Sequence, residues 1–154
     1  MSLSPETKII NFERSIKSYF INHFETAHGV KCFFDWLDDT PVDDVGVKLH
    51  RWVVVYFGEI SDGTVNSARV EIHLFTRLDD EGAELTKLLD ILNDALYDDA
   101  DVGLKAIPLY NTEVDPWIHI NGILPYKTGT YRTMYAKDDT KIKTVRLSCK
   151  WGGK

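Results

Sequence analysis

The chain has 154 residues, a length typical of one domain, and we expect a single domain over residues 1–154. Its 44% hydrophobic and 27% charged residues are ordinary for a globular protein with a buried core. A membrane-spanning protein is disfavoured because no apolar run approaches roughly 18 residues, and a secreted one because the N-terminus lacks a signal-peptide pattern. Two cysteines make no disulfide framework. A net charge of −6 disfavours a protein that binds nucleic-acid phosphates.

The first predicted element is a helix. Ser4, Pro5 and Glu6 supply a capping hydroxyl, a first-turn proline and an early acid. Apolar residues then recur every three or four positions and predict one face packed on a core. This stripe consists of Ile9, Phe12, Ile16, Phe20 and Phe24. Gly29 follows as a C-terminal stop, and the mixed charges opposite the stripe make a membrane-surface helix the weaker alternative.

Strands are predicted after this helix. Residues 31–37 form a short apolar run, and an acidic loop with a proline separates it from residues 52–57. Those six consecutive apolar residues are typical of a strand that is buried on both faces. From residue 67 onward apolar and polar residues alternate, with Val70, Ile72 and Leu74 on one face. We expect these last two segments to form a hairpin.

The second helix is predicted by leucines at helical spacing. They are Leu85, Leu88, Leu89, Leu92 and Leu96. The acidic residues 79–81 precede them, where capping oxygens and negative charge are favourable. Three more aspartates, at positions 98, 99 and 101, would lie at the negative end of the helix dipole, so the helix should end by about Tyr97. We expect the leucine face to pack on the alternating strand.

The remaining residues predict β structure. Residues 104–110 contain a proline, which limits them to an edge strand or a strand end. Residues 117–121 alternate, and residues 131–137 and 141–151 should form a hairpin. In the last run one face is formed by Val145, Leu147, Cys149 and Trp151, opposite Thr144, Arg146, Ser148 and Lys150.

This pattern predicts an α+β fold in which two helices pack on one face of a mainly antiparallel or mixed β-sheet. The order is helix, three strands, helix, and then three or four strands, which is α-β-β-β-α-β-β-β in its simplest form.

Sequence motifs for catalysis and for metal binding are missing, so we expect no enzyme activity, no cofactor and no metal. There is no phosphate-binding glycine loop, no zinc-binding histidine pair and no serine elbow. The acidic stretches lack the ordered spacing of calcium ligands and are expected to be solvated turns. Only His73 and His119 fall in strands where two histidines could approach each other. Cys32 and Cys149 lie in apolar strands and are expected to be small buried side chains.

Charge is segregated along the chain. Residues 79–101 hold nine acids and one lysine, whereas the C-terminal hairpin is locally basic. A protein with separate acidic and basic surfaces is better suited to docking on complementary protein surfaces than to binding a polyanion. The alternative is that the basic C-terminal hairpin, with its aromatic residues, stacks on the bases of a nucleic acid. The candidate interface residues are Lys141, Lys143, Arg146, Trp117 and Trp151.

The arrangement as a whole resembles the tail terminator proteins (tail completion or neck proteins) of long-tailed bacteriophages. The resemblance is carried by the opening helix, the hairpin of residues 52–60 and 68–77, the leucine helix of residues 80–96, and the return through residues 117–121 to two long strands that end in Leu-Ser-Cys-Lys-Trp. The resemblance covers most of the chain. It consists of the order of the elements and their residue patterns, since the family has no catalytic motif by which a member could be identified.

The resemblance implies an α+β subunit that assembles into a ring, expected to be a hexamer, which caps the tail tube, stops its polymerisation and offers the surface that joins the head. Its partners would be its own copies, the tail tube protein and head–tail connector proteins, with DNA only passing through the lumen and no membrane involved. It would be located in the virion after assembly in the host cytoplasm. Acids that would line the lumen without trapping DNA are Asp38, Asp39, Asp43 and Asp44 in one loop, and the turn of residues 98–101 is a second candidate. Both segments being only solvated loops is the alternative.

Two alternatives stay open. One is another joining protein of the virion, a connector or stopper, because such proteins have similar size and share much of this pattern. The other is a small α+β enzyme or ligand-binding domain whose site is assembled from distant residues.

Overall fold

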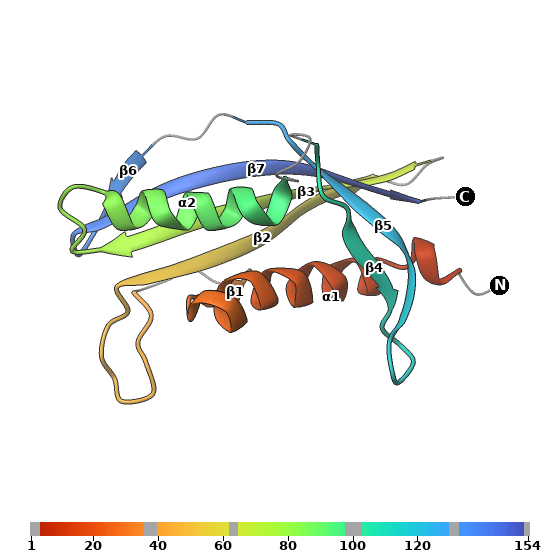
Figure 1. Cartoon of the computed structure of the whole chain (residues 1–154), viewed down its shortest axis with the longest axis horizontal. Coiled ribbons are helices and arrows are strands. Elements are labelled where there is room, and N and C mark those ends of the chain that lie inside the picture. The colour runs from red at the N-terminus through yellow and green to blue at the C-terminus, as the bar shows by residue number, and fades with distance from the viewer. Residues whose placement is uncertain (1–3, 36–39, 62–64, 98–102, 130–132, 153–154) are drawn as a thin grey trace.

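The computed structural model describes residues 4–35, 40–61, 65–97, 103–129 and 133–152. In this part of the chain, seven strands form one curled, mixed sheet that is accompanied by two main helices (Figure 1). The elements are η1 (Pro5–Thr7), α1 (Ile9–Phe20), η2 (Ile21–Thr26), β1 (Lys31–Phe34), β2 (Arg51–Ser61), β3 (Val65–Arg77), α2 (Ala83–Leu96), β4 (Ile107–Asn111), β5 (Ile118–Lys127), β6 (Thr133–Ala136) and β7 (Thr140–Gly152). The predicted α+β class is confirmed.

The sheet has the order β1-β2-β3-β7-β5-β4, and β6 also pairs with β7. β1 runs parallel to β2, and the other pairs are antiparallel. The two predicted hairpins, β2–β3 and β6–β7, are therefore confirmed. Four strands follow α2, one more than in the simplest predicted order. The additional strand is β4, which tolerates Pro108 because it lies at the edge of the sheet.

The core lies between the helices and one face of the sheet. Phe12, Ile16, Phe20 and Phe24 are buried as predicted, whereas Ile9 is 43% exposed. The leucine stripe of α2 joins the same cluster, together with the apolar faces of β2, β3 and β7. Trp151 is also in this cluster, only 3% exposed and stacked on Phe12 with ring centroids 4.1 Å apart. Trp151 is therefore a core residue, and its expected place in an interface is wrong.

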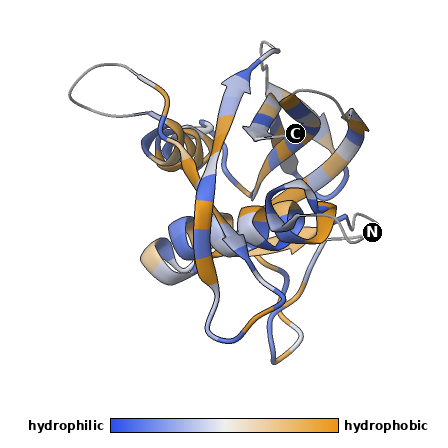
Figure 2. Cartoon of the chain, turned by 90° about the vertical axis from the view of Figure 1, so that its right-hand side faces the viewer, coloured by the Kyte–Doolittle hydropathy of each residue, from blue (hydrophilic) through white to orange (hydrophobic). Residues whose placement is uncertain are grey.

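The sheet also buries apolar residues on the face away from the helices. Trp52, Val54 and Phe75 form a smaller cluster there, in which Trp52 and Phe75 stack at 5.0 Å. β2 is thus buried on both faces over residues 52–55, as its apolar run predicted. Elsewhere hydrophobic and hydrophilic residues alternate along the strands (Figure 2), so the rest of this open face carries mainly polar side chains, with Leu124 and Tyr126 of β5 as exposed exceptions.

The start of α1 differs from the prediction. Ser4 makes no side-chain capping bond, and Pro5–Thr7 form a separate 3-10 turn before α1 begins at Ile9. The buried side chain of Asn11 joins this turn to the end of β4, since its amide donates to the carbonyl of Pro5 at 2.9 Å and its oxygen accepts from the backbone and hydroxyl of Thr112. The end of the helical segment is as predicted, because Gly29 adopts a φ of 66°.

Among the described residues, no helix combines the length and the apolar character needed to cross a membrane.

The packing of α2 gives a first prediction. Leu92 has no exposed surface and lies in the main core cluster. Replacing it with alanine should lower the free energy of unfolding by about 2–5 kcal/mol, because the cavity adds to the lost apolar burial. Asp90→Ala, at an exposed position of the same helix, is the control and should stay within about 0.5 kcal/mol. Chemical denaturation measures both, and equal stability of the two variants would contradict this packing.

Candidate functional site

The three predicted interface cations lie on two different faces of β7. Lys141 pairs with Thr76 across the strands, on the helix side, and its ammonium donates to the backbone carbonyl of Asp79. Lys143 is on the same side, opposite the buried Leu74. Arg146 lies on the open face, where its Nε donates to Glu71 at 3.2 Å. The predicted basic surface of all three residues is therefore wrong, because alternation along a strand sends odd and even positions to opposite faces.

The predicted lumen acids fall into two groups. Asp38 and Asp39 lie outside the described residues, as do the aspartates at positions 98, 99 and 101. Asp43 and Asp44 are exposed on the connection between β1 and β2. Asp43 also has a structural role, since its Oδ1 accepts the backbone N–H groups of Val45 at 3.0 Å and Val47 at 2.9 Å.

Residues 40–50 form an ordered projection, which we call the valine loop. Val42 and Lys48 make a β-bridge at its base, and Gly46 takes a φ of 84° at its tip. Three valines are exposed on it, namely Val42, Val45 and Val47, and Val45 is 82% exposed. Lys48 anchors the loop to the β6–β7 turn through an ion pair of 2.7 Å with Asp138. This hydrogen-bonded pairing lowers the pKa of Asp138.

A second apolar projection is the turn between β4 and β5, residues 111–118, which we call the tryptophan hairpin. Trp117 is 42% exposed there, beside the exposed Val114 and Ile118. The ring of Tyr110 supports both Trp117 and His119, with centroids 6.0 and 5.6 Å apart. In Figure 1 both segments project from the lower side of the molecule, the valine loop near its left end and the tryptophan hairpin near its right end. The sequence predicts Trp117 as an interface residue but gives no such prediction for the valines, although apolar residues inside an acidic segment are a signal of this kind.

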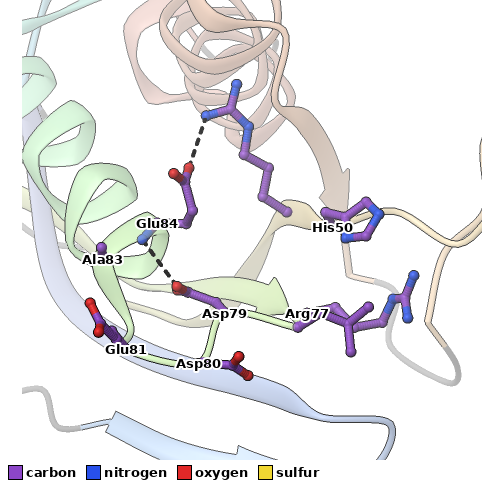
Figure 3. Close-up of a pocket in the computed structure, with 9 residues that line it drawn as sticks. His50, Arg77, Asp79, Asp80, Glu81, Ala83 and Glu84 are labelled. Carbon is purple, nitrogen blue, oxygen red and sulfur yellow. Dashed lines mark hydrogen bonds and ion pairs between the residues drawn. The ribbon is translucent and has the colours of Figure 1, made fainter.

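A groove of about 480 Å³ lies where β2 and β3 meet the start of α2 (Figure 3). It is lined mainly by polar and charged residues, namely His50, Arg51, Arg77, Asp79, Asp80, Glu81 and Glu84. Several of these already bind each other or the backbone: Arg51 lies 4.0 Å from Glu84, and Arg77 donates to the carbonyls of Lys48 and Leu49. These bonds stabilise the valine loop and the start of α2, so the charged side chains of the groove have structural roles.

Asp79 is the capping residue of α2, as the acidic residues before the helix predicted. Its carboxylate accepts the N–H groups of Leu85 at 2.9 Å and Glu84 at 3.3 Å, and the hydroxyl of Thr76 at 3.0 Å. Burial alone would raise the pKa of Asp79, but these hydrogen bonds and Lys141 outweigh it and hold the pKa below its usual range.

Removing this charge gives the second prediction. Because folding lowers the pKa of Asp79, the stabilisation by its carboxylate is complete above the ordinary carboxyl pKa of about 3.9 and disappears as the pH falls through the lowered value. Asp79→Asn should therefore cost about 0.5–2 kcal/mol at neutral pH and progressively less in acid. Denaturation of the wild type and the variant from pH 7 to pH 2 measures the difference in their free energies of unfolding. A difference that does not change with pH would contradict this role of the Asp79 carboxylate.

The open face carries a hydrogen-bonded row across β3 and β7. The Nδ1 of His73 lies 2.9 Å from the hydroxyl of Thr144, and its Nε2 lies 3.2 Å from Glu71, which also binds Arg146. Burial lowers the pKa of His73 despite the nearby carboxylate. His73 faces Thr144 and Glu71 faces Arg146 directly across the strands. Such cross-strand pairs are ordinary stabilising contacts of a sheet.

The two strand histidines have different neighbours, and both cysteines are buried. His119 contacts Tyr110 in the tryptophan hairpin, whereas His73 contacts Tyr56 and Phe75 on the open face. Within the residues that the structure describes, no group of three or more His, Cys, Asp or Glu could hold a metal ion. Cys32 and Cys149 are buried as expected, and burial raises the pKa of each thiol to about 12.

The thiols give the third prediction. With a pKa near 12 instead of about 8.5, each native cysteine has a thiolate fraction more than about a thousandfold below that of an exposed one. Iodoacetamide at pH 8 should therefore leave both cysteines unmodified in the folded protein and label both in urea, as mass spectrometry measures. Rapid labelling of native Cys32 would show an accessible, activated thiol.

Comparison with known proteins adds information on the fold. No family model and no curated protein matches the chain. Among solved structures 12 chains match, and one of them aligns over 92% of this chain and 96% of its own length, with a TM-score of 0.55 and 6% sequence identity. That protein bears a sequence identifier in place of a functional name. At such low identity the similarity shows a shared fold and nothing about activity.

Proposed function

We propose that the chain is a structural subunit of a bacteriophage tail, namely a tail terminator that assembles into a ring. The observation that carries this proposal is the position of the valine loop and the tryptophan hairpin, two exposed apolar projections at opposite ends of one subunit (Figure 1). Clustered exposed apolar side chains mark surfaces that bind other proteins.

A head-to-tail ring requires two different surfaces on each subunit, because one copy uses its first surface to bind the second surface of the next. The two ends of this molecule differ in this way. One end offers small apolar side chains beside acids, Val45 with Asp43 and Asp44, and the other offers the large ring of Trp117. Tryptophan is the residue most enriched among those that dominate binding energy.

The finer assignment to a tail terminator is supported by the order of elements. An opening helix, the β2–β3 hairpin, the leucine helix α2 and the long closing strand β7 occur in the order on which the resemblance rests. In this role a ring, expected to be hexameric, caps the tail tube in the virion, stops its growth and joins it to head–tail connector proteins, while DNA passes through the lumen.

The enzyme alternative is weakened by the roles of the candidate chemical groups. Asp79 caps a helix, His73 and Thr144 form a cross-strand pair, and Cys32 has a raised pKa. The connector alternative predicts a ring as well, so a test of function is needed to separate it from a terminator.

The fourth prediction concerns the ring itself. Sedimentation and negative-stain images should show a closed oligomer with a central hole, and Trp117→Ala should raise the concentration for half-assembly by about tenfold or more, equivalent to at least about 1.4 kcal/mol. Ile10→Ala, which removes an apolar side chain of similar exposure from α1, is the matched control. A wild-type protein that stays monomeric at all concentrations contradicts the proposal.

Function is then tested with assembling tail tube protein of the same phage. A terminator should stop tube growth and leave a cap visible at one end of each tube. Tubes that grow equally long with and without the ring would favour the connector alternative.

A further inference from the structure

We propose that the valine loop of one copy docks on the open face of the sheet of the next copy, at a basic surface formed by Arg69, Arg146 and Lys150. This inference rests on the proposed function and refines it: the surface that receives the valine loop is the open face of the sheet, at the same end of the subunit as the tryptophan hairpin but not the hairpin itself.

The receiving surface is continuous across three strands. Arg69 and Tyr126 both pair with Ser148 of β7, from its two sides, and Leu124 pairs with Lys150, so these side chains share the open face. Leu124 is 39% and Tyr126 40% exposed. We call these residues, with Arg146, the basic face.

The charge of the basic face is incompletely neutralised. Arg146 is paired with Glu71, but its side chain remains 66% exposed. Lys150 lies 5.4 Å from the ring centre of Tyr126, a contact that leaves its charge in place. Three cations therefore surround two exposed apolar side chains, with Glu71 as the acid among them. Beside them lies a hollow of about 610 Å³ that Arg69, Thr128 and Arg146 help to line.

The valine loop is complementary to this surface. Its tip, residues 43–47, carries two carboxylates and no base, and its most exposed side chain is Val45. The only nearby cation of the loop, Lys48, is bound to Asp138 at the base. An apolar side chain that follows two acids thus matches an apolar pair beside cations, and the hydrogen bonds of Asp43 hold the tip in one shape before binding.

The loop and the basic face of one copy lie too far apart to meet. The loop joins β2 at Arg51, which pairs with Thr76, and that end of the sheet also holds Thr140 opposite Arg77. Along β7, Arg146 is six residues further, roughly 20 Å away, and Lys150 is ten residues further, roughly 30 Å away, at about 3.3 Å per residue. The contact must therefore be made between copies, and a contact between unlike surfaces closes into a ring when the rotation from copy to copy adds up to a full turn. It places Asp43 and Asp44 at a subunit contact and not in the lumen.

The fifth prediction tests this contact by charge reversal. Asp43→Asn with Asp44→Lys keeps the oxygen that orders the loop but inverts the charge of the tip, and Arg69→Glu with Lys150→Glu inverts the basic face. Each pair of changes should raise the concentration for half-assembly more than about tenfold, because like charges then face each other. Combining all four changes in one chain should restore most of the assembly. Circular dichroism and thermal melting verify that each variant is folded.

Matched controls reverse equally exposed charges elsewhere. Asp90→Lys with Asp94→Lys on α2 controls for the loop, and Lys87→Glu with Lys137→Glu controls for the basic face. Both should assemble like the wild type. The specific contact would be overturned if the controls raised the concentration for half-assembly as much as the test variants do. It would also be overturned if the variant with all four substitutions assembled no better than either pair alone.

The outcomes also separate this inference from the proposed function. A wild-type protein without a ring overturns both. A wild-type ring that neither pair of reversals disturbs overturns only the docking of the valine loop. If Arg69→Glu with Lys150→Glu abolishes binding of a fluorescent DNA duplex while rings form normally, the basic face is a nucleic-acid surface and the inference is wrong.

Discussion

The antiparallel register between β3 and β7 is the constraint on which the rest of the structure depends. It aligns all of β3, from Val65 opposite Gly152 to Arg77 opposite Thr140. Side chains alternate along both strands, so a slip of one residue would exchange the buried and open faces. The same register therefore places Val70 and Leu147 under the helices and Arg69 and Arg146 on the open face. Core and candidate interface are two consequences of one alignment.

The elements that sequence predicted well are those whose pattern is local. The leucine spacing of α2, the apolar run of β2 and the alternation in β3 and β7 each depend on neighbouring residues, and the structure confirms them. The alternation in β7 also predicts on which face each cation lies, because the odd-numbered Lys141 and Lys143 point to the same face as the buried Val145. Grouping them with Arg146 by sequence distance overlooked that parity, and the basic surface was misplaced as a result.

Other features depend on contacts that no local pattern contains. Trp151 is buried because Phe12, near the opposite end of the chain, supplies a stacking partner. Asn11 is a polar residue on the buried face of α1, where it binds Thr112, and β5 and β6 share one edge of β7 at its two ends. The valine loop likewise looked like a solvated acidic segment, since its order comes from hydrogen bonds to Asp43 and from a distant aspartate, Asp138.

Charge and apolar surface have different effects in such an assembly. Exposed charges act over about 8–10 Å at physiological salt, so Asp44 and Lys150 would guide approach and set register without supplying most of the affinity. The strength must come from burying side chains such as Val45, Leu124 and Trp117, which salt does not screen. A ring built in this way would assemble more slowly at high salt, yet once closed it would resist salt, because releasing a subunit breaks two contacts simultaneously and exposes the apolar surface of both. That combination suits a subunit that must find its place quickly and then remain there.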